Sequence, residues 1–161
     1  MFFGCSSDVL EPYRSQRNKV FIIMAKNLLG QWAEQEAVNI LLKQHYEILK
    51  LNYFSRFGEI DIIAQYQNNL VFIEVKARTP TQLGKAFEVV SLSKQKKLFK
   101  TALKFLQDHP HYEQYYCRFD VISFDLHHKI AKNVQQDFTQ ISYDQAWIEN
   151  AFTLDPDLIN L

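Results

Sequence analysis

The chain has 161 residues, of which 47% are hydrophobic and 14% aromatic, as is typical of one folded domain with a hydrophobic core. Its 18 basic residues balance its 18 acidic residues, so the overall charge gives no sign of nucleic-acid binding and any such surface has to be local. No apolar run approaches the roughly 18 residues that cross a bilayer, and Cys5 and Cys117 show no disulfide framework. We therefore expect a cytoplasmic protein without a membrane partner.

The first 26 residues are irregular, contain Pro12 and lack the ordered regions of a secretory signal. We divide the chain into an irregular arm (residues 1–26), one domain (residues 27–152) and a tail (residues 153–161). Met24 directly precedes the first helical pattern, so we hypothesise that translation starts there, which mass spectrometry of the native protein would test.

Helical spacing begins after this arm. Apolar residues at three- and four-residue steps predict a helix from residue 27 to about residue 44. Glu34 lies on the side of that helix that faces the core or its edge. Alternation then predicts a strand over residues 46–53, and residues 55–58 form the turn into the next strand.

Residues 57–78 read FGEIDIIAQYQNNLVFIEVKAR, two apolar runs joined by a polar turn at residues 67–69. Short runs rich in Ile, Val and Phe are typical of strands. The first run contains Asp61 and the second contains Glu74 and Lys76, which share one face because side chains alternate along a strand. Ionised groups in such a setting are costly unless they are paired or bind a metal. The pattern therefore predicts a small divalent-metal site with a lysine beside it.

The second half of the chain continues the alternation of helix and strand. A helix is predicted from about residue 87 to residue 107, with Val90, Leu98 and Lys94 on its inner side. Its outer face carries four lysines: Lys96, Lys97, Lys100 and Lys104. Strands are predicted at residues 115–124 and 138–143, and the aromatic residues 147–152 are expected to dock on the domain. The order helix, three strands, helix, two strands indicates an α/β fold.

Asp61, Glu74, Lys76 and Glu34 together suggest phosphodiester chemistry. Mg²⁺ and Mn²⁺ prefer carboxylate oxygens, and they often use one or two protein carboxylates together with a substrate phosphate. Such an ion polarises a phosphodiester and lowers the pKa of its bound water. Lys76 would orient the attacking water or neutralise the transition state. Glu34 would complete the coordination with Asp61 and Glu74, or hold a metal-bound water.

Three motifs resemble those of the YraN-like family: Gly30-x-x-x-Glu34, Gly58-Glu59-Ile60-Asp61 and Val71-Phe72-Ile73-Glu74-Val75-Lys76-Ala77-Arg78. That family is similar to the restriction-endonuclease-like superfamily and to archaeal Holliday-junction resolvases, with their D…(D/E)xK signature. The resemblance covers about residues 27–152. It implies a restriction-endonuclease-like αβββαβ core with a mixed central sheet flanked by helices. It also implies Asp61, Glu74 and Lys76 as the catalytic set, with Glu34 as the helix carboxylate.

These features predict a metal-dependent nucleic-acid phosphodiesterase, with DNA favoured over RNA as the substrate. Two alternatives stay open: a catalytically silent nucleic-acid-binding or scaffold protein on the same fold, and an RNA-directed nuclease. Arg78, Lys94 and Lys97 are candidate phosphate contacts, although a structural ion pair explains Arg78 or Lys94 equally well. Resolvase-like enzymes act as dimers because two strands are cut. The sequence shows no clear dimer surface, so homodimerisation stays open.

Overall fold

The computed structural model describes residues 28–80, 90–129 and 141–153. An amino-terminal helix covers residues 28–43, close to the predicted range. The elements that follow are β1 (Glu47–Ser55), β2 (Gly58–Tyr66), β3 (Asn69–Arg78), α2 (Leu92–Asp108), the short 3₁₀ helix η2 (Pro110–Tyr112), β4 (Tyr116–Leu126) and β5 (Tyr143–Ile148). The chain is thus an α/β protein, as predicted. The proposed start at Met24 and most of the loop before α2 lie outside the described residues.

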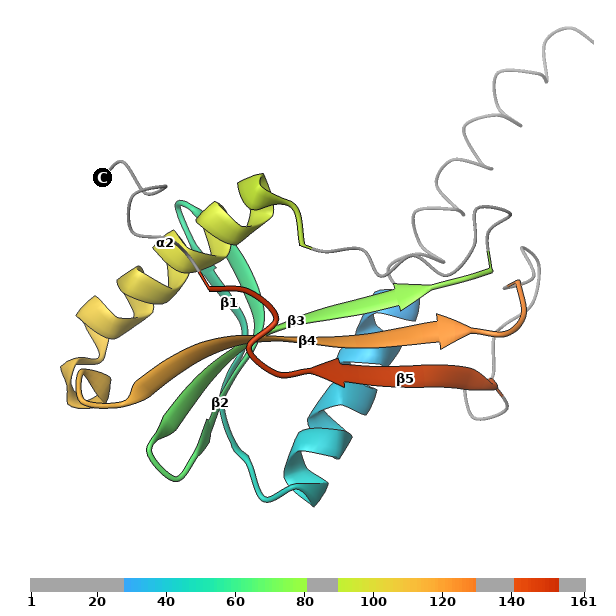
Figure 1. Ribbon diagram of the computed structural model, residues 1–161, viewed down its shortest axis with the longest axis horizontal. Helices are drawn as coiled ribbons and strands as arrows, with labels where there is room; N and C mark the ends of the chain where they lie inside the picture. The colour runs from blue at the N-terminus through green and yellow to red at the C-terminus, as the bar shows by residue number, and fades with distance from the viewer. Residues whose placement is uncertain (1–27, 81–89, 130–140, 154–161) are drawn as a thin grey trace, which may run out of the picture.

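The five strands form one mixed sheet in the order β1-β2-β3-β4-β5. Neighbouring strands are antiparallel except for β3 and β4, which run parallel. Parallel neighbours need a crossover connection, and α2 lies within the one that joins β3 to β4. The amino-terminal helix and α2 lie on opposite faces of the sheet (Figure 1). No helix in the described ranges is long and apolar enough to cross a membrane.

Each face of the sheet has its own core of buried side chains. The amino-terminal helix buries Leu29, Ala33, Ala37 and Leu41, which recur at four-residue steps, whereas Ile40 of the same apolar pattern is only partly buried. On the other face, α2 contributes Leu98, Ala102 and Phe105, which pack against Phe72 of β3. Phe152 is buried in this second core, so the predicted docking of the carboxy-terminal aromatic stretch is confirmed.

The predicted start of the second helix is too early. The helix begins at Leu92, because the Ser91 side chain accepts a hydrogen bond from the Lys94 backbone N–H and so caps the first turn. Val90 is buried, as expected for an inner residue, but it precedes the helix.

The predicted position of the fifth strand is also wrong. Residues 138–140 lie outside the described residues, and the strand is found at Tyr143–Ile148, where it pairs antiparallel with β4. The aromatic Trp147, which we assigned to the docking stretch, is part of this strand. Pairing with β4 sets the limits of β5, and local alternation in the sequence does not reveal that pairing.

Candidate metal and nucleic-acid site

The sheet forks where the two predicted acidic strands meet. Backbone pairing between β2 and β3 stops at Ile62 and Ile73, whereas β3 stays paired with β4 to its last residue. Asp61 is the β2 residue just beyond this last pair. Its Oδ2 accepts a hydrogen bond from the Val75 backbone N–H at 2.7 Å. At the point where the strands separate, the Val75 N–H of β3 thus donates to the Asp61 carboxylate and not to a backbone carbonyl of β2.

Glu74 lies on the α2 side of this fork. Phe72 of β3 packs in the core beneath α2, so alternation places Glu74 and Lys76 on that same face. Glu74 is only 9% exposed, and the Lys94 ammonium from α2 lies 3.1 Å from its Oε2. This close ion pair lacks hydrogen-bond geometry. Oε2 is therefore a buried oxygen without a hydrogen-bond partner among the described residues.

Both carboxyl groups have raised pKa values. Burial raises the pKa of Asp61 to about 7, with the charge of Glu74 adding to the rise, while the Val75 N–H and Lys94 oppose it. Burial also raises the pKa of Glu74, against the lowering effects of Lys94 and Lys76. Two carboxylates that are poorly solvated and repel each other favour the uptake of a proton or a cation.

Glu34 lies close to this pair, on the amino-terminal helix. It is half-buried, its Oε2 accepts a hydrogen bond from Asn52 Nδ2 at 3.2 Å, and its charge adds to the raised pKa of Asp61. Asn52 is a residue that the sequence reasoning missed. Asn52 lies in the middle of β1 and has a φ of +49°. Its neighbours Leu51 and Tyr53 pair with Ile62 and Ile60 of β2, so Asn52 lies opposite Asp61.

A local signal for Asn52 does exist. Asparagine is several-fold enriched at positive φ and is depleted in strands, so an asparagine inside an alternating apolar run marks an irregular point. At this point β1 turns out of the regular pleat, and the Asn52 side chain reaches Glu34. The positive φ of Asn52 thus accompanies a hydrogen bond that links β1 to the third carboxylate beside the fork.

The other predicted site residues lie on the same two elements. Lys76 is half-buried two residues beyond Glu74, and its charge lowers the pKa of that group. Arg78 is half-buried at the last position of β3. Lys97 is exposed one turn beyond Lys94 on α2. The structure thus brings Asp61, Glu74 and the Lys94 ammonium together at one fork.

Asp61 and Glu74 are the side chains at the fork that could hold a hydrated divalent cation. The buried Glu74 Oε2 accepts no hydrogen bond, although the Lys94 ammonium lies 3.1 Å from it and would compete with a cation for that carboxylate. In the described parts of the chain, no three His, Cys, Asp or Glu side chains come close enough to hold a metal together. The local donor set is therefore the pair Asp61 and Glu74, with Glu34 nearby. Mg²⁺ commonly binds one or two carboxylates and keeps several waters, so a pair is sufficient.

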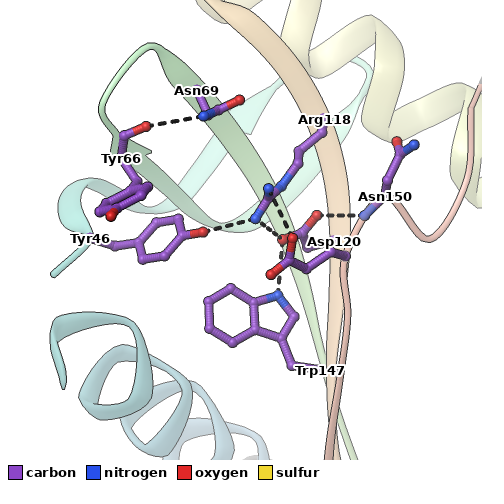
Figure 2. Close-up of polar contacts among 8 residues, drawn as sticks. Tyr46, Tyr66, Asn69, Arg118, Asp120, Trp147 and Asn150 are labelled. Atoms are coloured by element: carbon purple, nitrogen blue, oxygen red, sulfur yellow. Dashed lines mark hydrogen bonds and ion pairs between the residues drawn. The ribbon is translucent and has the colours of Figure 1, made fainter. Parts of the chain in front are cut away.

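Another carboxylate, that of the buried Asp120 on the other face of the sheet, has hydrogen bonds to both of its oxygens (Figure 2). Asp120 accepts hydrogen bonds from Arg118 Nη2 at 3.1 Å, from Trp147 Nε1 at 2.9 Å and from a backbone N–H just after β5 at 2.9 Å. Arg118 also donates to the Tyr46 hydroxyl. This network joins β4, the end of β5 and Tyr46, the residue directly before β1, which is a structural role. Glu74, by contrast, has an oxygen without a hydrogen bond.

The uncharacterised protein family UPF0102 matches residues 33–124 of the chain. A UPF0102 protein of Acinetobacter baumannii (strain AYE) is 59% identical over 127 residues, which cover 79% of this chain and 96% of that protein. A relative from Acinetobacter baylyi is 55% identical over 126 residues, covering 78% of this chain and 90% of the relative. A relative from Psychromonas ingrahamii is 37% identical over 134 residues, which cover 81% of this chain and 94% of the relative. In agreement with its resemblance to the YraN-like family, the chain belongs to the uncharacterised protein family UPF0102.

Proposed function

We propose that this protein is a Mg²⁺- or Mn²⁺-dependent phosphodiesterase that cleaves DNA, similar to Holliday-junction resolvases. The observation that carries the proposal is the pair of carboxyl groups at the fork of the sheet, the half-buried Asp61 and the buried Glu74, both with raised pKa values. The order of helix, three strands, helix and strand supports a restriction-endonuclease-like core.

In this proposal each residue at the fork has its own role in phosphodiester cleavage. Asp61 and Glu74 would hold the cation, which when bound polarises the phosphodiester and lowers the pKa of water. Lys76, on the same face of β3 as Glu74, would neutralise the negative charge that builds up on the phosphate. Glu34, held by Asn52, would accept a hydrogen bond from a water beside the pair.

One observation favours a second function. The Lys94 ammonium already neutralises part of the charge of Glu74, so the fold has no need of a metal to compensate this carboxylate. A catalytically silent nucleic-acid-binding or scaffold protein would keep such an ion pair as a structural contact. Mn²⁺ binding distinguishes the two functions, because a silent protein has no reason to bind the ion through Asp61 and Glu74.

The test is a cleavage assay with Mg²⁺ or Mn²⁺ and labelled substrates: linear duplex, flap, four-way junction, single-stranded DNA and structured RNA. We expect wild type to cut DNA, and Asp61→Asn or Glu74→Gln to lose at least about a hundredfold in rate. Glu113→Gln, which removes an exposed carboxylate in the turn after η2, is the matched control and should keep full activity. Cleavage of RNA alone would replace DNA as the substrate. No cleavage by a wild type that also binds no Mn²⁺ would favour the silent protein.

A further inference from the structure

The turn between β1 and β2 lies against the middle of α2. The hydroxyls of Ser55 and Thr101 lie 3.0 Å apart in a buried hydrogen bond. At Gly58, a Cβ atom would come within 3.4 Å of the Lys97 Cβ, and the φ of +153° is one that side-chain-bearing residues rarely adopt. Glycine therefore allows the turn to approach the helix closely, and the two residues at the tip of the turn are held beside α2.

Two cations meet on one aromatic ring at this tip. The guanidinium carbon of Arg56 lies 4.7 Å from the centroid of the Phe57 ring, and the Lys100 ammonium lies 5.9 Å from it. Both distances are within the range of cation–π attraction, so the ring holds two positive charges near each other. Like charges held close together repel, and an anion that binds between them relieves that repulsion.

These cations have no acidic partners among the residues that the structure describes. Neither Arg56, Lys97 nor Lys100 forms an ion pair there. Two other lysines of α2 do: Lys94 pairs with Glu74, and Lys104 pairs with Asp108. The uncompensated charges therefore lie between two ion pairs, one at the fork and one at the end of the helix.

The helix geometry places these charges in a row. Lys97 and Lys100 lie within about 60° of each other around α2, on the flank that faces the turn. From Lys94 to Lys100 the helix rises about 9 Å. One strand of a duplex carries a phosphate every 3.4 Å or so along the axis, so this length corresponds to about two or three phosphates.

We propose that Arg56, Lys97 and Lys100 form a track that binds the phosphate backbone of one DNA strand beside Asp61 and Glu74. The track rests on the proposed function, because that function makes DNA the polymer that approaches the fork. It adds the path of the strand, which runs along the joint surface that α2 and the β1–β2 turn form where they pack together.

The test is DNA binding by the full chain, measured by fluorescence anisotropy in EDTA from 50 to 200 mM salt, so that cleavage cannot occur. The track variant combines Arg56→Gln, Lys97→Gln and Lys100→Gln. The control variant combines substitutions of three exposed lysines on other elements: Lys43→Gln, Lys50→Gln and Lys129→Gln. Both variants lose three positive charges, so overall charge affects them equally. A charge-preserving variant, Lys97→Arg with Lys100→Arg, tests whether the sites still fold and bind.

We expect the slope of log affinity against log salt to become shallower by about 2 to 3 in the track variant, since each phosphate contact contributes about 0.9. The control and charge-preserving variants should keep the wild-type slope. Equal losses in the track and control variants would overturn the track, as would a track variant that binds like wild type, or a wild type that binds only RNA. Asp61→Asn should still bind DNA. If wild type cuts nothing and the track variant alone loses binding, the proposed hydrolysis fails and the track stands.

Discussion

Replacement of Asp61 by asparagine should stabilise the folded chain at neutral and higher pH. The pKa of Asp61 rises from its ordinary value of 3.8 to about 7, chiefly because the group is buried. Between these two values the folded chain keeps a proton that the unfolded chain has released, so the free energy of unfolding falls as the pH rises. Because of this shift, the free energy of unfolding of wild type should fall by about 2 to 3 kcal/mol between pH 5 and pH 8.

Urea unfolding in EDTA measures this effect. The asparagine side chain of the Asp61→Asn variant retains an oxygen that can accept the Val75 N–H, but it carries no charge, so the variant should not show the loss. We expect the stability advantage of Asp61→Asn over wild type to grow by about 2 to 3 kcal/mol from pH 5 to pH 8, and to vanish below about pH 3, where Asp61 is protonated in the unfolded chain as well. Glu113→Gln should follow wild type. An Asp61→Asn protein that is less stable than wild type at pH 8, or a difference that does not depend on pH, would refute the reasoning.

Three further changes test other contacts. Lys94→Gln removes the ammonium beside the carboxylate pair and should tighten Mn²⁺ binding at pH 8 several-fold by calorimetry, whereas Lys104→Gln, which also loses an ion pair, should leave it unchanged. Asn52→Gly should cost less stability in urea unfolding than Asn52→Ala, because glycine adopts a positive φ freely. Equal costs would argue against the positive φ at this position. Asp120→Ala leaves the charge of Arg118 without its buried partner and should lower the free energy of unfolding by about 3 to 5 kcal/mol. A loss below about 1 kcal/mol would show that the network is not structural.

The elements that could be predicted from the sequence are those whose pattern is local. The amino-terminal helix and the β2–β3 hairpin show their periodicity within a few residues, and both are found close to the predicted ranges. β5 could not be located this way. It is an edge strand in which no residue is fully buried, so its alternation is weak. Its position depends on pairing with β4 and on the bond from Trp147 to Asp120, which are contacts between distant parts of the chain.

In the candidate site, too, the features with a local sequence pattern could be predicted, and those that depend on contacts between distant residues could not. Asp61 and Glu74 stand out in the sequence because they interrupt apolar runs on neighbouring strands. The fork that separates these strands does not stand out, because it depends on a carboxylate that takes the place of a backbone acceptor for Val75. The ion pair between Lys94 and Glu74 depends on how α2 packs on the sheet, and the sequence left that pairing open.

Calorimetric titration of Mn²⁺ into wild type and Asp61→Asn at pH 8 tests whether the fork is a metal site. At this pH both carboxyl groups of a metal-binding pair can release their protons to the ion. We predict that wild type binds Mn²⁺ with release of protons, and that the folded Asp61→Asn protein loses this binding. A wild type that binds no Mn²⁺, or a variant that binds it equally well, would contradict the assignment of Asp61 and Glu74 as metal ligands.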